Sequence, residues 1–183
     1  LFFLFSIAVL VNDSTSNPYL CKQLCRCDLE RKFVDCNHKI LNKLKREYFI
    51  GITNVTILYL EYNNIEVLES NVFQAVKSTV EIIFLSNNKI SIIHSGTFQN
   101  MKRLKILDLR NNDLRNFEDN SFIGDVSLKE LRLSNNEITY LRKLLFRDLI
   151  SLKTLYLHYN KIRNINSILF SNCTNLERLD VAM

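Results

Sequence analysis

The stretch Leu104-Lys-Ile-Leu107-Asp-Leu109-Arg-Asn-Asn112 is one copy of a sequence motif that recurs along the chain and decides its fold. Leucines stand at its first, fourth and sixth places and an asparagine at its ninth. The asparagine returns after one step of 25 residues and then in steps of 24, at Asn63, Asn88, Asn112, Asn136 and Asn160. A fixed period of roughly 20 to 50 residues is typical of repeat proteins, in which each unit packs on its neighbours.

Each copy also contains a regular set of apolar residues. The leucines at the fourth and sixth places alternate with polar residues, and this period of 2 predicts a strand with one buried face. An aliphatic residue follows two places after the asparagine, another apolar residue three places later, and a phenylalanine lies in the back half. These positions are Ile65, Ile90, Leu114, Ile138 and Ile162; Leu68, Ile93, Phe117, Leu141 and Ile165; and Phe73, Phe98, Phe122, Phe146 and Phe170.

The pattern L-x-x-L-x-L-x-x-N resembles that of the leucine-rich repeat family, and it covers the chain from about Val55 to its end. The resemblance implies an α/β-type repeat solenoid. This is a curved horseshoe with a parallel β-sheet on the concave side and irregular or short helical segments on the convex side. Since one unit cannot bury its apolar side chains alone, the units must stack, and each well-buried Leu or Phe contributes roughly 1.5 to 3 kcal/mol.

The five asparagines are expected to have a structural role. An asparagine at the bend after each strand can donate to and accept from backbone groups that have left the sheet, and a buried unpaired group costs about 1 to 3 kcal/mol. The regular phase favours a hydrogen-bonded ladder along the stack. Simple turn formation is the alternative.

The chain opens on an apolar run, Leu1 to Val11, followed by a polar stretch. Eleven residues are too few to span a bilayer but suit the apolar core of a secretory signal peptide. We therefore interpret residues 1–20 as a signal-peptide remnant and leader. A buried strand or helix of the mature domain is the alternative.

Four cysteines with the spacing C-x3-C-x-C-x8-C lie just before the repeats, at Cys21, Cys25, Cys27 and Cys36. They resemble the N-terminal cysteine cap of extracellular leucine-rich repeat proteins such as Toll-like receptors and Slit. Spacing alone leaves three pairings open. The resemblance implies Cys21 with Cys27 and Cys25 with Cys36. A zinc site formed with His38 is the competing interpretation, but the spacing and a secreted chain favour disulfides.

Three parts are thus expected: the leader 1–20, a disulfide cap 21–54, and repeats 55–183, of which five are complete and the sixth is truncated. The fifth cysteine, Cys173, occupies a place where other repeats have Val76, Met101 and Leu149. We expect a buried free thiol there, with a catalytic or intermolecular role as the alternative. N-x-S/T sequons make Asn12, Asn54 and Asn172 candidate glycosylation sites.

The chain stops at Met183, one residue before the next asparagine is due. A terminal repeat normally needs a cap, so we expect a fragment of a longer protein. A membrane tether is expected in the missing C-terminal part. The resulting localisation is secreted or at the cell surface.

Residues between the core leucines should point outward from the sheet, and these form the candidate binding surface. Aromatic and arginine side chains are enriched at interface hot spots. The candidate ligand-binding residues are Tyr59, Tyr62, Phe84, Arg110, Arg132, Tyr156, His158 and Tyr159. Apart from Tyr62 and Tyr159, which lie next to them, these outward-pointing residues form two columns along the stack. The column between the two core leucines also holds Asp108 and Asp180, and the column just after the second leucine also holds Ser86 and Ser134. Sideways packing of the aromatic rings along the sheet is the alternative to binding.

A net charge of +5 and a pI near 9.0 would suit an acidic partner, a heparan-like glycan or a nucleic acid. Many lysines, however, stand beside acidic residues, and the one dense basic group is Lys43, Lys45 and Arg46. A solvated surface of mixed sign is therefore the preferred interpretation.

No Walker, G-x-S-x-G or H-E-x-x-H sequence occurs, and the three histidines lie in unrelated segments. We expect no enzyme, no cofactor and no metal. The preferred function is the ligand-recognition ectodomain of a cell-surface receptor of the innate immune or adhesion type. Its concave face would bind a protein ligand or co-receptor, with a glycan or glycolipid as a further possibility and no nucleic acid. A soluble secreted matrix or immune protein is the alternative, and a polyanion binder is a third.

Overall fold

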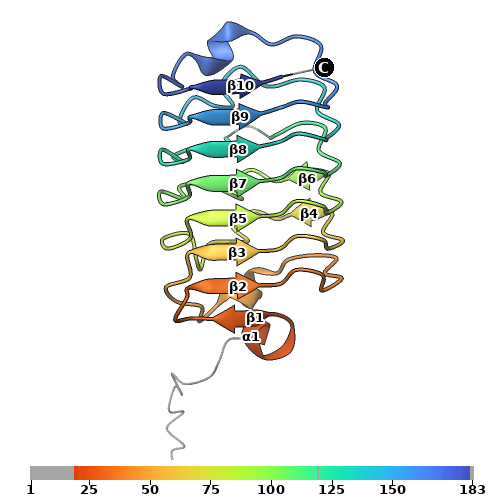
Figure 1. Ribbon diagram of the computed structural model, residues 1–183, viewed down its shortest axis with the longest axis vertical. Helices are drawn as coiled ribbons and strands as arrows, with labels where there is room; N and C mark the ends of the chain where they lie inside the picture. The colour runs from red at the N-terminus through yellow and green to blue at the C-terminus, as the bar shows by residue number, and fades with distance from the viewer. Residues whose placement is uncertain (1–18, 119, 182–183) are drawn as a thin grey trace, which may run out of the picture.

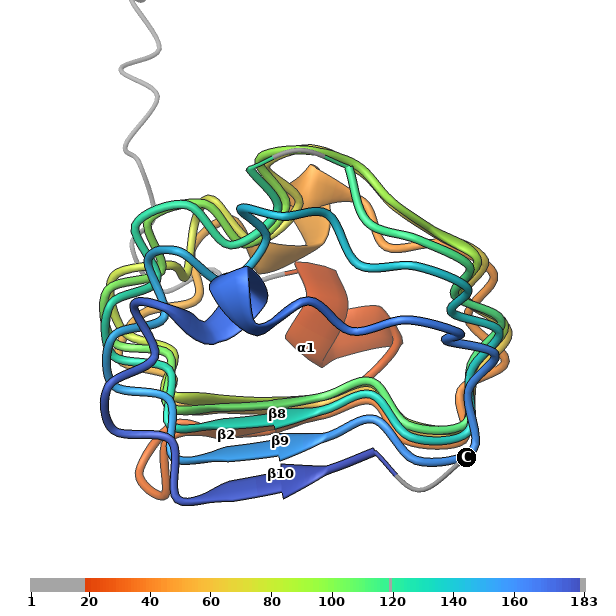
Figure 2. The same ribbon diagram turned by 90° about the horizontal axis from the view of Figure 1, so that it is seen from above.

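The computed structural model describes residues 19–118 and 120–181 of the chain, which form one solenoid of stacked coils (Figure 1). Each coil contributes one short strand to the same side of the stack. Seen along the stack, the strands lie one above another, and irregular segments form the opposite side (Figure 2). The expected signal-peptide segment and Asn12 lie outside the described residues.

The main sheet has eight strands in the order β1-β2-β3-β5-β7-β8-β9-β10. Strands β1 and β2 are antiparallel, and every later pair is parallel. The strands are β1 (Arg26–Asp28), β2 (Phe33–Asp35), β3 (Ile57–Tyr59), β5 (Ile82–Phe84), β7 (Ile106–Asp108), β8 (Glu130–Arg132), β9 (Thr154–Tyr156) and β10 (Arg178–Asp180). Because Leu107, Leu131 and Leu155 pair in register, equivalent residues of successive coils stack directly. The expected repeat solenoid is confirmed.

The opposite side of the stack has little regular structure. A second sheet pairs only β4 (Val67–Leu68) with β6 (Ile92–Ile93). The helices among the described residues are α1 (Tyr19–Gln23), at the N-terminal end of the stack, and two single-turn 3-10 segments, η1 (Arg46–Phe49) and η2 (Ser167–Phe170). A column of phenylalanine rings runs along this side, from Phe49 in the cap through the five repeat phenylalanines, with centroids 5.5–6.4 Å apart.

The cap continues the solenoid at its N-terminal end. Disulfides join Cys21 to Cys27 and Cys25 to Cys36, the pairing that the family resemblance implies. All four sulfurs are therefore bonded, and the alternative zinc site with His38 does not hold. Strand β2 pairs in register with β3, and Cys36 takes the buried place that Leu60 has in the next coil. Leu20 of α1, which is fully buried, covers the end of the core.

The asparagine ladder connects each coil with the one before it. Nδ2 of Asn112 donates to the carbonyl oxygen of Leu109 in its own coil and to that of Leu85 in the preceding coil, both at 3.0 Å. Its Oδ1 accepts from the Ile90 backbone N–H at 2.9 Å. The other four asparagines make the equivalent contacts. These side chains therefore satisfy backbone groups of two coils at once.

One core column contains a carboxylate that the sequence analysis did not consider. Asp125 occupies the place of Val76, Met101, Leu149 and Cys173 in the other coils and is fully buried. Its Oδ1 accepts from the Met101 backbone N–H at 2.9 Å, whereas Oδ2 has no partner among the described residues. Burial, and to a lesser extent the nearby Asp148, raise the pKa of Asp125 to about 7, although the Met101 hydrogen bond opposes the shift. The column also holds Cys173, which is the expected buried free thiol.

The ladder predicts that Asn112→Asp lowers the free energy of unfolding by roughly 2–4 kcal/mol, because an acceptor replaces a donor that faces two carbonyls. Chemical denaturation measures the effect. The matched control is Asn116→Asp, an exposed asparagine of the same coil, which should change stability by no more than about 0.5 kcal/mol. Equal losses in the two variants would contradict the ladder's role.

Asp125 predicts a stability that depends on pH. The folded chain holds the Asp125 proton more tightly than the unfolded chain, whose pKa is near 3.8. This group therefore stabilises the fold most below about pH 4, and the contribution is lost as the pH rises through about 7, a difference on the order of 4 kcal/mol. Asp125→Asn should remove that loss.

The measurement for Asp125→Asn is the urea midpoint between pH 4.5 and 8.5, with the exposed Asp113→Asn as control. The urea midpoint of the Asp125 variant should be close to that of the unsubstituted chain at the acidic end, should rise above it up to about pH 7, and should keep a constant lead at higher pH. A gap that stays constant over this range would show that the carboxyl does not titrate there.

Candidate functional site

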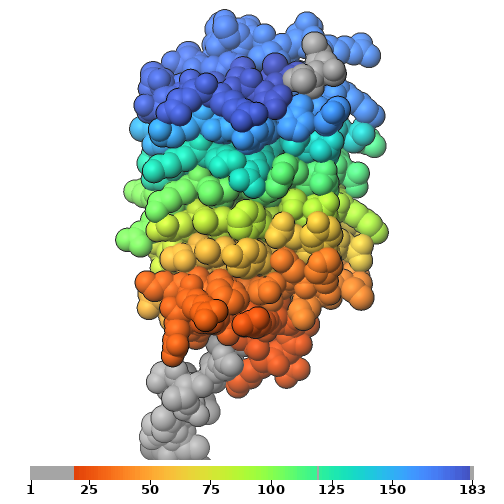
Figure 3. All heavy atoms as spheres, in the orientation of Figure 1, coloured from red at the N-terminus to blue at the C-terminus, as the bar shows by residue number. Residues whose placement is uncertain are grey.

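The outward side of the main sheet, with the turn that follows each strand, is called the sheet face below. It faces the viewer in Figure 1, and the side chains of successive coils form a continuous surface there (Figure 3). The eight residues proposed from the sequence all lie on this face or its turns. Seven of them fall into three groups, which differ in how their side chains are held, and Tyr62 lies apart from these groups in a turn.

The first group is an aromatic stack at the N-terminal end. The rings of Tyr59 and Phe84 stack with centroids 5.4 Å apart, and Phe33 of strand β2 meets Tyr59 edge to face at 6.0 Å. The Arg26 guanidinium lies 5.7 Å from the Phe33 centroid. These rings pack sideways on one another and stay half-buried, so each keeps part of its surface available to a partner. Phe33 was missed because the sequence analysis began the repeats at Val55.

The turn after each strand has a residue in the left-handed conformation, which glycine adopts freely and which, among L-residues, mainly asparagine and aspartate adopt. Three turns use Asn87, Asn111 and Asn135, with φ between 54° and 57°. The same place holds His38, Tyr62 and Tyr159, with φ of 55° to 56°. Tyr62 is 52% exposed and Tyr159 68% exposed. Tyr62 also stacks on His38 with centroids 4.6 Å apart.

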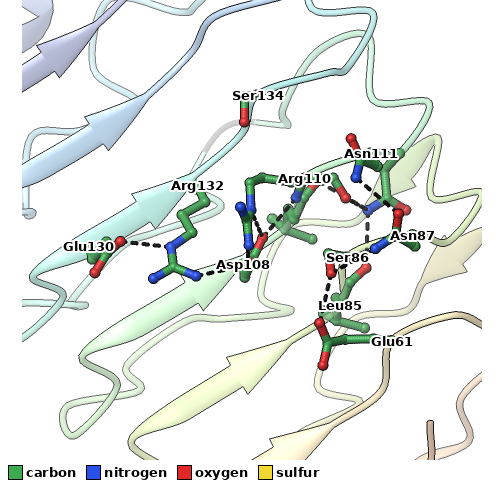
Figure 4. A network of polar contacts seen from close by, with 12 residues as sticks. Glu61, Leu85, Ser86, Asn87, Asp108, Arg110, Asn111, Glu130, Arg132 and Ser134 are labelled. Atoms are coloured by element: carbon green, nitrogen blue, oxygen red, sulfur yellow. Dashed lines mark hydrogen bonds and ion pairs between the residues drawn. The ribbon is translucent and has the colours of Figure 1, made fainter.

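The second group is an ion cluster at the middle of the sheet. Asp108, expected to face solvent, is instead fully buried because Arg110 and Arg132 cover it. Nη2 of Arg110 donates to Asp108 Oδ2 at 2.6 Å, and Nη1 of Arg132 donates to the same oxygen at 3.1 Å. Nε of Arg132 also donates to Glu130 at 2.7 Å (Figure 4).

These contacts hold both guanidinium groups in their charged form. The hydrogen bond to Asp108 raises the pKa of Arg110 above its usual value. Burial lowers the pKa of Arg132, but hydrogen bonds to Glu130 and Asp108 outweigh burial, and the net shift is upward. Ser86 and Ser134 in the next column are buried as well, which corrects the expectation that this whole column is exposed.

The third group lies on the last two coils. The His158 ring meets both tyrosines edge to face, with centroid distances of 6.2 Å to Tyr156 and 5.3 Å to Tyr159. Nδ1 of His158 lies 3.2 Å from Asp180 Oδ2, although the geometry is not that of a hydrogen bond. The Arg178 guanidinium lies 5.2 Å from the Tyr156 centroid. This group is thus mixed aromatic and charged.

The candidate glycosylation sites among the described residues and two groups of basic side chains lie away from the sheet face. Asn54 and Asn172 are exposed, and Asn172 Nδ2 donates to the Arg147 carbonyl at 2.9 Å. Lys43, Lys45 and Arg46 are exposed on the cap. A second basic group, which the sequence analysis missed, borders a hollow of about 610 Å³. It consists of Lys77, Lys102 and Arg103, which come from two successive coils.

Within residues 19–118 and 120–181, no group of three or more histidine, cysteine or acidic side chains is placed to hold a metal ion. In the same part of the chain, no helix has the length and apolar character needed to cross a lipid bilayer.

Comparison with known proteins identifies the class of repeat. The Leucine rich repeat family matches residues 78–138 and 126–182, which together are more than half of the chain. The chain therefore belongs to the leucine-rich repeat family. A search of curated protein sequences found no match.

Solved structures with the same fold include parts of two Toll-type proteins. The Toll–Spätzle complex, described as a molecular hub in Drosophila development and innate immunity, shares 26% identity over 80% of this chain, with a TM-score of 0.76. A TLR13–ssRNA13 complex shares 32% identity over 86% of the chain, with a TM-score of 0.71.

The leucine-rich repeat domain of APL1B is also similar, with 26% identity over 70% of this chain and a TM-score of 0.64. This chain spans only 20%, 22% and 38% of the Toll, TLR13 and APL1B chains, respectively. The likeness therefore concerns one part of each of these longer chains.

The left-handed turn predicts that Tyr159 is held at a cost in stability. Asparagine tolerates this conformation and alanine does not, so Tyr159→Asn should unfold with a free energy about 1 kcal/mol above that of Tyr159→Ala. Both variants lose the ring, so their difference reports the backbone preference together with a side-chain hydrogen bond to Asn135 of the kind that Asn111 makes with Asn87. Urea denaturation measures both, and indistinguishable midpoints would mean that the turn is not strained.

Proposed function

We propose that this chain is a protein-binding module outside the cell, forming part of the ligand-recognition ectodomain of a cell-surface receptor. The observation that carries the proposal is the pair of exposed tyrosines, Tyr62 and Tyr159, in backbone turns that asparagine fills elsewhere. Residues held in a costly conformation occur preferentially at functional sites. Here they flank the same face on which the aromatic stack and the paired arginines lie.

The composition of the sheet face supports a protein partner. Tyrosine and arginine are enriched among the residues that contribute most to protein–protein affinity. The Toll–Spätzle complex is a similar structure with a protein ligand, and the two disulfides of the cap suit an oxidising extracellular compartment. A soluble secreted protein with the same binding face is the alternative.

The charges on the sheet face argue against a long polyanion there. TLR13 is a similar structure in complex with single-stranded RNA, so RNA has to be considered. However, Glu61 lies in the column of Arg110, Asp180 lies in that of Arg132, and Glu130 lies in the neighbouring column of the same face. A chain of phosphates crossing several coils would meet these carboxylates as well as the arginines.

The test is capture of extracellular proteins by the secreted, glycosylated chain. Tyr59→Ala combined with Phe84→Ala should reduce capture of a specific partner at least tenfold, because the two rings form one stack. The matched control is Tyr140→Ala, since Tyr140 is an exposed tyrosine outside the sheet face. Retained capture by the control and loss in the double variant is the expected result.

Other outcomes would point to other functions. Unchanged capture by the double variant would exclude the aromatic stack as the binding site. Binding of a single-stranded RNA oligonucleotide that depends on the same rings would overturn the protein-partner proposal. Retention on heparin that is lost on neutralising Lys77, Lys102 and Arg103 would instead indicate a polyanion site away from the sheet face.

A further inference from the structure

A hollow of about 300 Å³ opens on the sheet face between strands β7, β8 and β9. It lies over the part of the sheet where the buried Asp108 holds two arginines. The residues that line it are Arg110, Glu130, Arg132, Ser134, Tyr156 and His158. They come from three successive coils, so the stacking of the solenoid brings them together.

Asp108 holds the two guanidinium groups in place beside this hollow. Both of its oxygens already accept hydrogen bonds, Oδ1 from the backbone N–H and Nε of Arg110, and Oδ2 from both arginines. Since Asp108 is fully buried, a ligand does not displace it. The arginines are thus oriented before any ligand arrives, which lowers the entropic cost of binding.

Several hydrogen-bond donors at the hollow remain unused. Arg110 Nη1 and Arg132 Nη2 have no partner among the described residues. The Ser134 hydroxyl is buried and also lacks a partner. In Figure 4 its oxygen points toward the region of the two arginines. A buried hydroxyl without an acceptor is costly, so a ligand acceptor placed at this hollow would gain a hydrogen bond from Ser134.

An equivalent serine two coils earlier shows which acceptor fits this position. Ser86 stands two coils before Ser134 in the same column, and its hydroxyl donates to the carboxylate Oε1 of Glu61 at 2.9 Å. Glu61 belongs to the coil that precedes Ser86. The corresponding residue before Ser134 is Arg110, which has no acceptor to offer. The carboxylate that satisfies Ser86 within the chain is therefore missing at Ser134.

We propose that this hollow binds one carboxylate, the side chain of an Asp or Glu of the protein that docks on the sheet face. The two arginine Nη groups hold the carboxylate oxygens, and Ser134 donates a further hydrogen bond. Ser134 is covered by the side chains around it, so one of them must turn aside when the carboxylate enters. The proposal rests on the protein-binding function above and names the chemistry of one contact within it.

A single carboxylate suits the local charge better than a phosphate chain does. Two arginines and two acidic residues, Asp108 and Glu130, leave the cluster close to neutral, so the unused donors give the site its selectivity. A planar carboxylate matches the forked guanidinium geometry. A multiply charged strand would extend toward Glu61 on one side and Asp180 on the other.

The test uses the glycosylated chain labelled with ¹⁵N-arginine, with Nε–H signals assigned by single Arg→Lys variants. Acetyl-glutamate amide is titrated in, and acetyl-glutamine amide and inorganic phosphate serve as separate probes. We expect the Arg110 and Arg132 signals to shift with the glutamate probe, in roughly the millimolar range, and not with the glutamine probe.

The hydroxyl is tested by Ser134→Ala, with Ser86→Ala as the matched control. Ser134→Ala should weaken glutamate binding about tenfold and leave the fold intact, because it removes an unpaired group. Ser86→Ala should leave binding unchanged, since Ser86 already has Glu61. A purely structural role for Ser134 predicts no change in either variant, and that result would overturn its part in the site.

Two further outcomes would overturn the proposal as a whole. Equal shifts with the glutamate and glutamine probes would show that charge is not recognised, and stronger shifts with phosphate at the same concentration would assign the hollow to a phosphate ligand. Protein capture does not enter this titration. If the titration fails but the sheet face still captures a protein, this inference alone is wrong. If the titration succeeds but the sheet face captures no protein, the proposed function is wrong.

Discussion

The structure depends on the hydrogen bonds of one asparagine per coil. Where the chain leaves each strand, backbone groups of two neighbouring coils lose their sheet partners, and the asparagine side chain supplies both a donor and an acceptor there. A short strand of three residues adds few hydrogen bonds of its own. The coil spacing, the register of the sheet and the alignment of the buried leucines therefore all rely on these side chains, whose loss would leave buried backbone groups unpaired.

The elements that follow the repeat period could be predicted from the sequence. The strands, the asparagine ladder and the phenylalanine column all return every 24 or 25 residues, and the physical demand is the same in each coil. Departures from the period were harder to foresee. Asp125 replaces an apolar residue in one coil, and Phe33 belongs to a strand whose coil lacks the leucine motif. Comparing each position across all coils, cap included, would have flagged both.

The candidate site was predictable only in outline, because side chains that touch on the sheet face are about 24 residues apart in sequence. The alternation of strand residues correctly placed Arg110 and Arg132 on that face. The alternation could not show that the two arginines would cover Asp108. It predicts the direction in which a side chain points, and not which neighbouring side chains bury it. Asp108 is therefore buried, although it was expected at the surface, because arginines of its own coil and of the next one pair with it. The same ion pairs orient the two arginines.

The two exposed tyrosines show how the scaffold and the binding surface are connected. Tyr62 precedes Asn63, and Tyr159 precedes Asn160, so each strained residue lies directly beside a ladder asparagine. The side chain of Asn63 binds the carbonyls of Leu60 and Glu61, which fixes the backbone just before Tyr62. Neighbouring coils therefore hold the turn in a conformation that tyrosine alone disfavours. A ring held in this way loses little conformational freedom when a partner binds. The ladder thus stabilises the turn that orients the ring, at a cost to the stability of the fold.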